Sequence, residues 1–235
     1  MPFQHALVTG ANRGLGLEFV RQLLAAGAHV VAACRQPGRA TTLNGLAGEH
    51  PGRLHVLPLD LAEPRSHAEL AHELPLVLGE DGRLDLLVNN AGVLHSGERF
   101  GDLEAAGFDD SFRTNATGPL LLTQALAPRL ADGARVLNLS SQLGSIAQTT
   151  RFGTPSYAMA KAALNMATVL MAQARSERGI VVVAASPGWA RTDMGGSGAD
   201  LEPATPVAGL LRLAAQLGAD DSGRFLDWTG EDLPW

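Results

Sequence analysis

Short apolar runs alternate with amphipathic segments along the whole chain, and this alternation limits the possible folds more than any other feature of the sequence. Runs such as LDLLVNN and IVVVAAS are almost continuously apolar, which is typical of strands that are covered on both faces. Strands that alternate strictly with helices are joined by right-handed crossovers and pair in parallel. The sequence therefore predicts an α/β fold, a doubly wound parallel sheet with helices on both faces.

The elements expected from this pattern cover most of the chain. Strands are expected at Ala6–Thr9, His29–Ala33, Leu54–Leu57, Leu84–Asn89, Arg135–Leu139, Ile180–Ala184 and Arg224–Leu226. Helices are expected at Leu15–Ala26, Arg39–Gly48, Arg65–Leu78, Phe108–Leu130, Pro155–Arg178 and Pro206–Leu217. No linker or repeat interrupts this order, so residues 1–235 are expected to form one domain with its ligand site beyond the carboxyl ends of the strands.

Composition and charge exclude several classes of function. Of the 235 residues, 46% are hydrophobic and 18% are charged, which supplies a buried core and excludes a disordered chain. The formal net charge is -6 and there is no run of Lys or Arg, so a nucleic-acid partner is not expected. With Cys34 as the one cysteine, and with His67 and His72 outside any zinc-motif spacing, neither a disulfide nor a metal site is expected. Because there is no basic leader and no stretch of ~18 apolar residues, we expect a cytoplasmic protein with no membrane partner.

The first predicted strand runs into a glycine-rich turn, TGANRGLG, and then into a helix. Gly10, Gly14 and Gly16 allow a tight turn and a close approach of the backbone to a ligand. The helix that follows presents free N–H groups and a positive dipole end, which suit a pyrophosphate. The spacing differs from the common G-x-G-x-x-G fingerprint, and no Lys-Ser/Thr follows that would indicate a P-loop. We expect a dinucleotide site here, with a ligand-free glycine turn as the alternative.

The end of the second predicted strand favours a phosphorylated ribose. An NAD enzyme would place an acidic residue there to hold the ribose 2′-hydroxyl, but the sequence reads CRQ, with no acid before Glu49. Arg35 in this segment and Arg13 in the glycine turn are suited to a 2′-phosphate, which arginine binds through two hydrogen bonds. NADP(H) is therefore expected as the preferred cofactor and NAD(H) as the alternative, unless both arginines are only solvated surface charges.

A tyrosine and a lysine share one face of a predicted helix. Tyr157 and Lys161 lie four residues apart in PSYAMAKAALN. Free tyrosine titrates near pH ~10 and is a poor acid–base catalyst at neutral pH, but an ammonium group ~6 Å away would favour the phenolate by roughly 2–3 kcal/mol, or about two pKa units. Such a pair is common on solvated helix faces. Here it follows a strand ending in LNLSS, and the glycine turn lies at the other end of the chain.

Together, these motifs resemble the short-chain dehydrogenase/reductase family over nearly the whole sequence. The matching segments are TGANRGLG at 9–16, NNAG at 89–92, RTNATGP at 113–119, NLSS at 138–141, the Tyr157-x-x-x-Lys161 pair and SPG at 186–188. Three further segments, GSIAQTT, SPGWARTDMGG and GRFLDWTGEDLPW, resemble the C-factor and sniffer-type carbonyl reductase subgroup. The resemblance implies a Rossmann-type fold with a seven-stranded sheet. It also implies a homodimer or homotetramer that pairs through the helices expected at 108–130 and 155–178.

The resemblance also assigns catalytic roles. Tyr157 is the general acid that protonates the substrate oxygen, Lys161 lowers the pKa of this tyrosine and holds the nicotinamide ribose, Ser141 hydrogen-bonds the substrate oxygen, and Asn115 supports a proton relay through water. Because Pro119 has no N–H to donate to the carbonyl four residues before it, we hypothesise that the Asn115 carbonyl holds the relay water.

The position of the catalytic serine departs from the usual family pattern. In many relatives it lies thirteen residues before the tyrosine, which here is Gly144. The loop at 142–155 therefore carries a small insertion, and Ser140 and Ser145 compete with Ser141 for the role. We favour Ser141 because it lies immediately outside the predicted strand end.

The remaining site residues follow from the same motifs. The expected cofactor-binding residues are Gly10, Asn12, Arg13, Gly14, Leu15, Gly16, Arg35, Asp60, Leu61, Asn89, Asn90, Ala91, Gly92, Tyr157, Lys161, Pro187, Gly188 and Thr192. Asn89 is equally compatible with a structural turn, and Asp60 with a helix cap. The substrate is expected to contact Leu94, Leu143, Trp189 and Met194.

The expected substrate walls are mostly apolar, which favours a neutral aldehyde or ketone over a charged hydroxy acid. Arg151, in the inserted loop, would reverse this preference if it faced the substrate. For Trp189, the alternative to a substrate contact is a place in the buried core. We therefore expect an NADPH-dependent oxidoreductase that reduces a small or medium apolar carbonyl compound. The alternative is a dinucleotide-binding signalling or regulatory protein, because the resemblance to C-factor includes a developmental signalling role.

Overall fold

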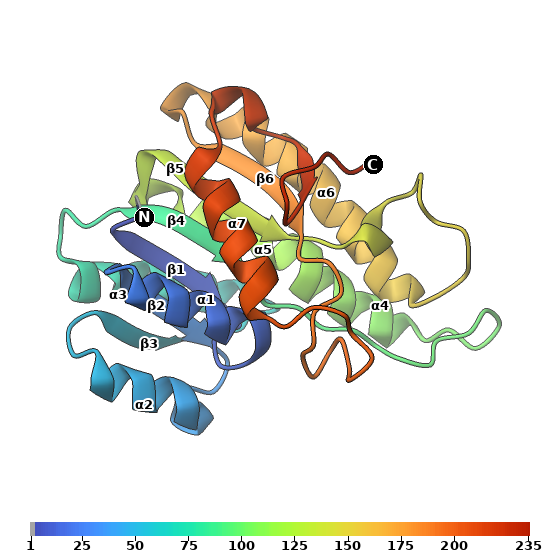
Figure 1. Ribbon diagram of the computed structural model, residues 1–235, viewed down its shortest axis with the longest axis horizontal. Coiled ribbons are helices and arrows are strands. Elements are labelled where there is room, and N and C mark those ends of the chain that lie inside the picture. Colours follow the sequence, from blue (N-terminus) through green and yellow to red (C-terminus); the bar gives the residue numbers. More distant parts are fainter. Residues whose placement is uncertain (1–2) are drawn as a thin grey trace.

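The computed structural model describes residues 3–235, and its central feature is a seven-stranded sheet with the order β3-β2-β1-β4-β5-β6-β7 (Figure 1). All neighbouring strands pair in parallel. The strands are β1 (His5–Thr9), β2 (His29–Cys34), β3 (Leu54–Pro58), β4 (Leu84–Asn89), β5 (Leu130–Leu139), β6 (Val181–Ser186) and β7 (Phe225–Asp227). The prediction of a doubly wound, Rossmann-type parallel sheet is confirmed.

Helices cover both faces of the sheet. The α-helices are α1 (Gly14–Ala25), α2 (Thr41–Glu49), α3 (Pro64–Leu78), α4 (Ala105–Phe112), α5 (Gly118–Leu126), α6 (Pro155–Arg175) and α7 (Ala204–Gln216). Short 3-10 turns lie at Pro37–Arg39, Ala127–Arg129, Gln142–Gly144, Ser176–Arg178 and Ala219–Asp221, and a π-helical turn at Arg113–Thr117. In the view of Figure 1, α7 crosses in front of the sheet, whereas α5 and α6 lie behind it.

Side chains that alternate along each strand build two separate cores. In β1, Val8 packs into the core that α1, α2 and α7 cover, and the preceding Leu7 packs into the core that α3, α5 and α6 cover. Both side chains are fully buried. This explains why the strands are apolar on consecutive residues, since each face has its own helical layer.

Two predicted boundaries are wrong, for local reasons. β5 begins at Leu130 rather than at Arg135, because Leu130 already pairs with Leu84 of β4, and the register shifts before the pairing continues at Arg135. The single helix expected at 108–130 is divided into α4, the π-helical turn and α5. Pro119 has no N–H for the α-helical ladder, and the N–H of Gly118 donates to the carbonyl of Arg113 instead.

The topology places the ligand site at the carboxyl ends of the central strands. β1 lies between β2 and β4, so the chain crosses to opposite sides of β1 in its two halves. A crevice forms at such a switch point, outside the carboxyl ends of the strands. Within residues 3–235, no helix combines the length and the apolar character that are needed to cross a bilayer.

Candidate active site

A cavity of about 330 Å³ opens at this switch point. Its walls come from the glycine turn, from the segments after β2 to β6, from the π-helical turn and from the first turns of α6. The predicted cofactor residues that line it are Gly10, Asn12, Arg13, Gly14, Leu15, Arg35, Asp60, Leu61, Asn90, Ala91, Gly92, Tyr157, Lys161, Pro187, Gly188 and Thr192. Motifs that are distant in the sequence thus surround one space.

Three predicted site residues lie beside the cavity rather than on its wall: Gly16, Asn89 and Asn115. The buried Asn89 side chain donates to Thr123 Oγ1 at 3.1 Å and to Asn138 Oδ1 at 2.8 Å, which ties β4 to its neighbours. This contact corresponds to the structural alternative for Asn89. The Asn115 amide exchanges two hydrogen bonds of 2.8 Å with the backbone of Val93, and so it holds the segment that follows β4.

The glycine turn depends on the absence of side chains. Gly10 has a φ of 63°, and a Cβ there would lie 2.8 Å from Ala91 Cα. A Cβ on Gly16 would lie 2.3 Å from the Gly10 carbonyl oxygen and 2.5 Å from Asn90 Nδ2. Asn90 in turn donates through Nδ2 to the Thr9 carbonyl at 2.8 Å. The turn is therefore packed directly against the segment after β4, with its backbone exposed to the cavity.

The residues present fit a dinucleotide. The N-terminus of α1 faces the cavity through Gly14 and Leu15, so free backbone N–H groups meet a ligand there. Both predicted arginines line the same cavity, and both are exposed at its mouth. Arg13 Nη1 pairs with Asp193 Oδ2 at 3.0 Å, which links the glycine turn to the segment after β6. Because the Arg13 side chain is 66% exposed and the Asp193 side chain is 75% exposed, this ion pair contributes little to the stability of the fold.

Asp60 forms a local turn and also reaches the cavity. Its Oδ1 accepts the N–H of Ala62 at 3.0 Å, and its own N–H donates to Ser66 Oγ at 3.0 Å. These bonds shape the turn that leads into α3, in line with the capping alternative. Because Asp60 and Leu61 also line the cavity, the two roles are compatible.

Tyr157 and Lys161 come together on α6, as their spacing predicts. They are only 8% and 4% exposed, and Lys161 Nζ lies 5.5 Å from the centroid of the tyrosine ring. The ammonium group donates to the Leu139 carbonyl at 2.6 Å, and this contact holds it at the end of β5. Both side chains line the cavity. The lysine therefore reaches the reaction space from beneath the tyrosine.

The predicted direction of the tyrosine pKa shift is wrong for this structure. Burial raises the pKa of Tyr157 to about 12, and the nearby Ser141 hydroxyl offsets part of that shift. Burial also lowers the pKa of Lys161 to about 8. Desolvation disfavours both charged forms, and at Tyr157 its effect is larger than the lowering by Ser141. Tyr157 is consequently a protonated phenol at neutral pH.

The hydrogen bonds of the three candidate serines separate them. Ser140 is buried and donates to Asn165 Oδ1 at 2.6 Å, and the fully buried Ser145 donates to the Pro234 carbonyl at 2.7 Å. Ser141 lines the cavity and accepts the N–H of Leu143 at 3.1 Å, which leaves its own hydrogen free to donate. The geometry favours Ser141, as the strand-end argument predicts.

All four predicted substrate walls line the cavity. They are Leu94, Leu143, Trp189 and Met194. Trp189 is 56% exposed and donates through Nε1 to the Gly195 carbonyl at 2.8 Å, so it is not a core residue. Arg151 is exposed and is not part of the cavity wall. The predicted substrate walls are therefore largely apolar.

Several cavity residues were not among the predicted contacts. They include Cys34, Leu59, Val93, Thr114, Leu139, Ser140, Ala190, Asp193 and Gly195. All of them except Thr114 end a strand or lie in the segment that follows one, so they obey the rule that ligands bind beyond the carboxyl ends. Cys34 is 3% exposed, and burial raises the pKa of its thiol, as expected of a small buried hydrophobe. Thr114 carries no motif of its own and is brought in by the π-helical turn.

Known proteins share this sequence and architecture. Residues 4–201 match the family model described as short chain dehydrogenase. C-signal of Myxococcus xanthus is 43% identical over 156 residues, which are 66% of this chain and 94% of that protein. NADPH-bound carbonyl reductase from chicken fatty liver has a TM-score of 0.94 at 37% identity over 100% of both chains, and carbonyl reductase Sniffer of D. melanogaster has 0.93 at 32% over 99% of both. The chain belongs to the short-chain dehydrogenase/reductase family, and these similar proteins support the subgroup that its motifs predicted.

Proposed function

We propose that this protein is an NADPH-dependent oxidoreductase that reduces small or medium apolar aldehydes or ketones. The observation that carries the proposal is the convergence of Tyr157, Lys161 and Ser141 on one cavity that also contains the glycine turn. The apolar walls at the substrate end favour a neutral carbonyl compound, since a buried charge would lack a partner there. Two similar proteins are described as carbonyl reductases.

The cofactor assignment rests on the two arginines and on the missing acid after β2. Arg13 and Arg35 would hold a 2′-phosphate, while Gly10, Gly14 and the start of α1 would hold the pyrophosphate. Thr192 and Gly188 would lie at the nicotinamide end. Bound NADPH supplies the hydride for the reaction. The similar chicken carbonyl reductase is described as NADPH-bound.

The side chains of this protein position the carbonyl group and supply the proton. Tyr157, protonated at neutral pH, donates its proton to the substrate oxygen as negative charge develops there. Ser141 donates a hydrogen bond to the same oxygen and so favours that charge. Lys161 places a positive charge beneath the phenol, which stabilises the phenolate that is left.

A water held by the Asn115 carbonyl would return the proton to this pair. The Asn115 side chain is already engaged with Val93, so only the main chain of this residue is available for the relay. The π-helical turn at Arg113–Thr117 alters the carbonyl ladder where Pro119 follows. Ordered water within hydrogen-bonding distance of that carbonyl in a crystal structure would support the relay, and a dry site would refute it.

The proposed function is tested by assaying a panel of aldehydes and ketones with NADPH and with NADH. We expect turnover of apolar carbonyl compounds with NADPH and weak or no turnover of carboxylate-bearing ones. Turnover of charged hydroxy-acid pairs alone would overturn the substrate class, and no turnover with any member would overturn the enzymatic function.

Replacing Ser141 with Ala is expected to lower kcat about 20-fold. One hydrogen bond to a developing oxyanion contributes ~1.5–2 kcal/mol to the transition state. The matched control is Ser140→Ala, which removes a hydroxyl bonded to Asn165. Its main effect should be on stability, seen as a lower Tm, rather than on kcat. If Ser140→Ala instead had the larger effect on kcat, the two roles would be reversed.

The pH dependence of cofactor capture should report Lys161. kcat/KM for NADPH reflects groups of the free enzyme, and the lysine holds the nicotinamide ribose best when it is charged. We expect a plateau at low pH and a tenfold fall per pH unit above about pH 8, where burial places its pKa. Lys161→Arg should extend the plateau, because arginine stays protonated. If kcat/KM for NADPH fell at the same pH in Lys161→Arg as in the wild type, the titrating group would be a residue other than Lys161.

A signalling or regulatory role is the second candidate, favoured by the identity to C-signal of Myxococcus xanthus. An intact catalytic set permits turnover without proving that turnover is the purpose. Tyr157→Phe separates the two candidates in a strain that lacks the native protein. Loss of the biological effect together with the reductase activity supports the enzyme, and an effect that survives supports the regulator.

We expect a homodimer or homotetramer through α4, α5 and α6. Met159, Met166 and Leu170 of α6 are each more than half exposed, and Leu121 of α5 lies outside the core as well. Exposed apolar patches of this kind mark protein interfaces. The mass in solution, measured by light scattering, should be two or four times 24.5 kDa and should fall in Met166→Lys. A wild-type monomer would contradict this expectation.

A further inference from the structure

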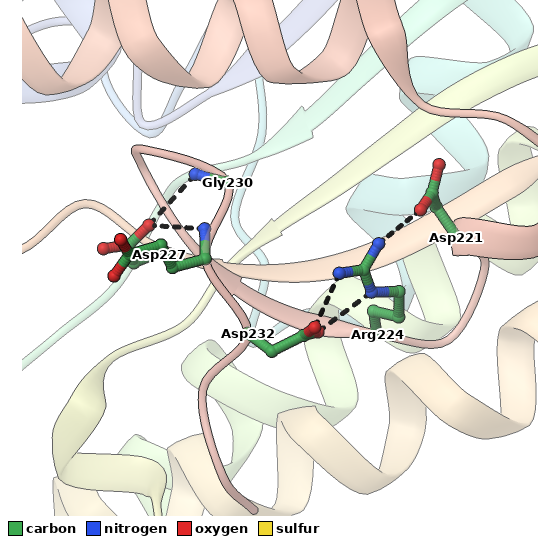
Figure 2. Close-up of polar contacts among 6 residues, drawn as sticks. Asp221, Arg224, Asp227, Gly230 and Asp232 are labelled. Atoms are coloured by element: carbon green, nitrogen blue, oxygen red, sulfur yellow. Dashed lines mark hydrogen bonds and ion pairs between the residues drawn. The ribbon is translucent and has the colours of Figure 1, made fainter.

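The tail at residues 225–235 consists of β7 and the chain that follows it, and it is held in a fixed path along the edge of the sheet. Asp227 Oδ1 accepts the N–H groups of Thr229 and Gly230 at 2.8 and 3.0 Å, which closes a tight turn. Figure 2 shows the bond from Gly230. Arg224 pairs with Asp221 on one side and with Asp232 on the other, the latter through two bonds of 2.7 and 2.9 Å (Figure 2). The returning chain is thus fastened to β7 at both sides of the turn.

The last residues of this segment contact the loop that carries Ser141. The hydroxyl of Ser145 donates to the Pro234 carbonyl at 2.7 Å, and the N–H of Ala147 donates to the Trp235 carbonyl at 2.8 Å. The Trp235 ring stacks on Phe225, with centroids 5.5 Å apart and an interplanar angle of 24°. None of these tail residues lines the cavity. Their contact with the site is therefore indirect.

The opposite side of the same loop packs on the catalytic helix. A Cβ on Gly144 would lie 2.8 Å from Lys161 Cβ, so loop and helix are in direct backbone contact. Asn165 Nδ2 donates to the Gly144 carbonyl at 3.3 Å. The loop at 141–149 is therefore held between α6 on one side and the tail on the other, and Ser141 and Leu143 project from it into the cavity.

We propose that Ser145 and Trp235 are positioning residues, through which the tail at 225–235 fixes Ser141 and Leu143 against the substrate. This inference rests on the proposed carbonyl reduction and deepens it. A hydrogen-bond donor must sit close to the developing oxyanion to act, and a small displacement lowers the rate. The glycine turn follows β1, which is three strands from β6 and four from β7 in the sheet. Loosening the tail should consequently impair the carbonyl step and spare cofactor binding.

The experiment compares Ser145→Ala and Trp235→Ala with a control of similar structural cost. Arg53→Ala is that control, because Arg53 is half-buried and bonds the Leu24 carbonyl at 2.9 Å, beside the β2–β3 edge. For the two tail variants we expect kcat/KM for the carbonyl substrate to fall 10- to 100-fold and the Kd of NADPH to change less than twofold. Trp235→Phe keeps a stacking ring on Phe225 and should restore most of the activity.

A second measurement follows the loop itself and needs no turnover. Backbone amide exchange at residues 142–149 should speed up at least tenfold in Trp235→Ala and not in Arg53→Ala, because the Ala147 N–H loses its fixed acceptor. If the wild type reduced no carbonyl compound, the proposed function would fail while this exchange still tested the link between tail and loop. Tail variants that match Arg53→Ala in both kcat/KM and amide exchange would overturn the inference.

Discussion

Replacing Tyr157 with Phe is expected to lower kcat for carbonyl reduction by about 10³-fold. The change removes one hydroxyl and keeps the ring that packs beside Lys161. General acid catalysis by a positioned side chain contributes 10²- to 10⁴-fold, and the Tyr157 hydroxyl is the proton donor proposed for the substrate oxygen. kcat is measured under saturating NADPH with the best substrate of the panel.

Two further measurements on Tyr157→Phe check that cofactor binding and folding are preserved. The Kd of NADPH should change less than threefold, and Tm should stay the same or rise, because the buried phenol is replaced by an apolar ring. Phe152→Leu, which alters a half-exposed aromatic residue of the inserted loop, provides a neighbouring aromatic variant with its catalytic set intact. A Tyr157→Phe enzyme that retained a tenth of the wild-type kcat would assign the proton transfer to another group.

The parts of the site that the sequence predicts are those carried by strand ends. Continuous apolar runs locate β1, β4 and β6, and the residues after each run meet because parallel strands share one edge. This reasoning predicts that residues of the glycine turn, NNAG and SPG line one cavity, and they do. Helical periodicity alone was enough to predict that Tyr157 and Lys161 lie on the same face of α6.

Features that depend on three-dimensional packing were beyond such reasoning. The expected long helix is divided beside Gly118, where a Cβ would lie 2.6 Å from the Leu61 carbonyl oxygen, and that contact comes from the segment after β3. The sign of the Tyr157 pKa shift depends on burial, which a four-residue spacing to Lys161 does not reveal. The bond from Ser145 to Pro234 spans 89 residues and has no local signature.

The double variant Arg13→Ala/Arg35→Ala is expected to raise the Kd of NADPH about 100-fold and that of NADH less than threefold. Each charged hydrogen bond to a phosphate contributes ~1.5–3 kcal/mol, so the loss of both arginines amounts to at least ~3 kcal/mol, which is about 100-fold in Kd. NADH has a hydroxyl where NADPH has the 2′-phosphate, and the arginines distinguish these two groups. Both values are measured by fluorescence titration of the reduced nicotinamide.

The ion pair between Arg13 and Asp193 supplies the matched control. Asp193→Asn frees Arg13 from its partner without removing a phosphate ligand. Because an exposed pair of this kind contributes only about 0–1 kcal/mol, NADPH should bind to Asp193→Asn as tightly as to the wild type or up to about fivefold more tightly. Added salt should weaken NADPH binding more than NADH binding in the wild type, and this difference should vanish in the double variant. Equal Kd values for the two cofactors in the wild type would contradict the assignment of these arginines and leave the enzyme with no preference for the 2′-phosphate.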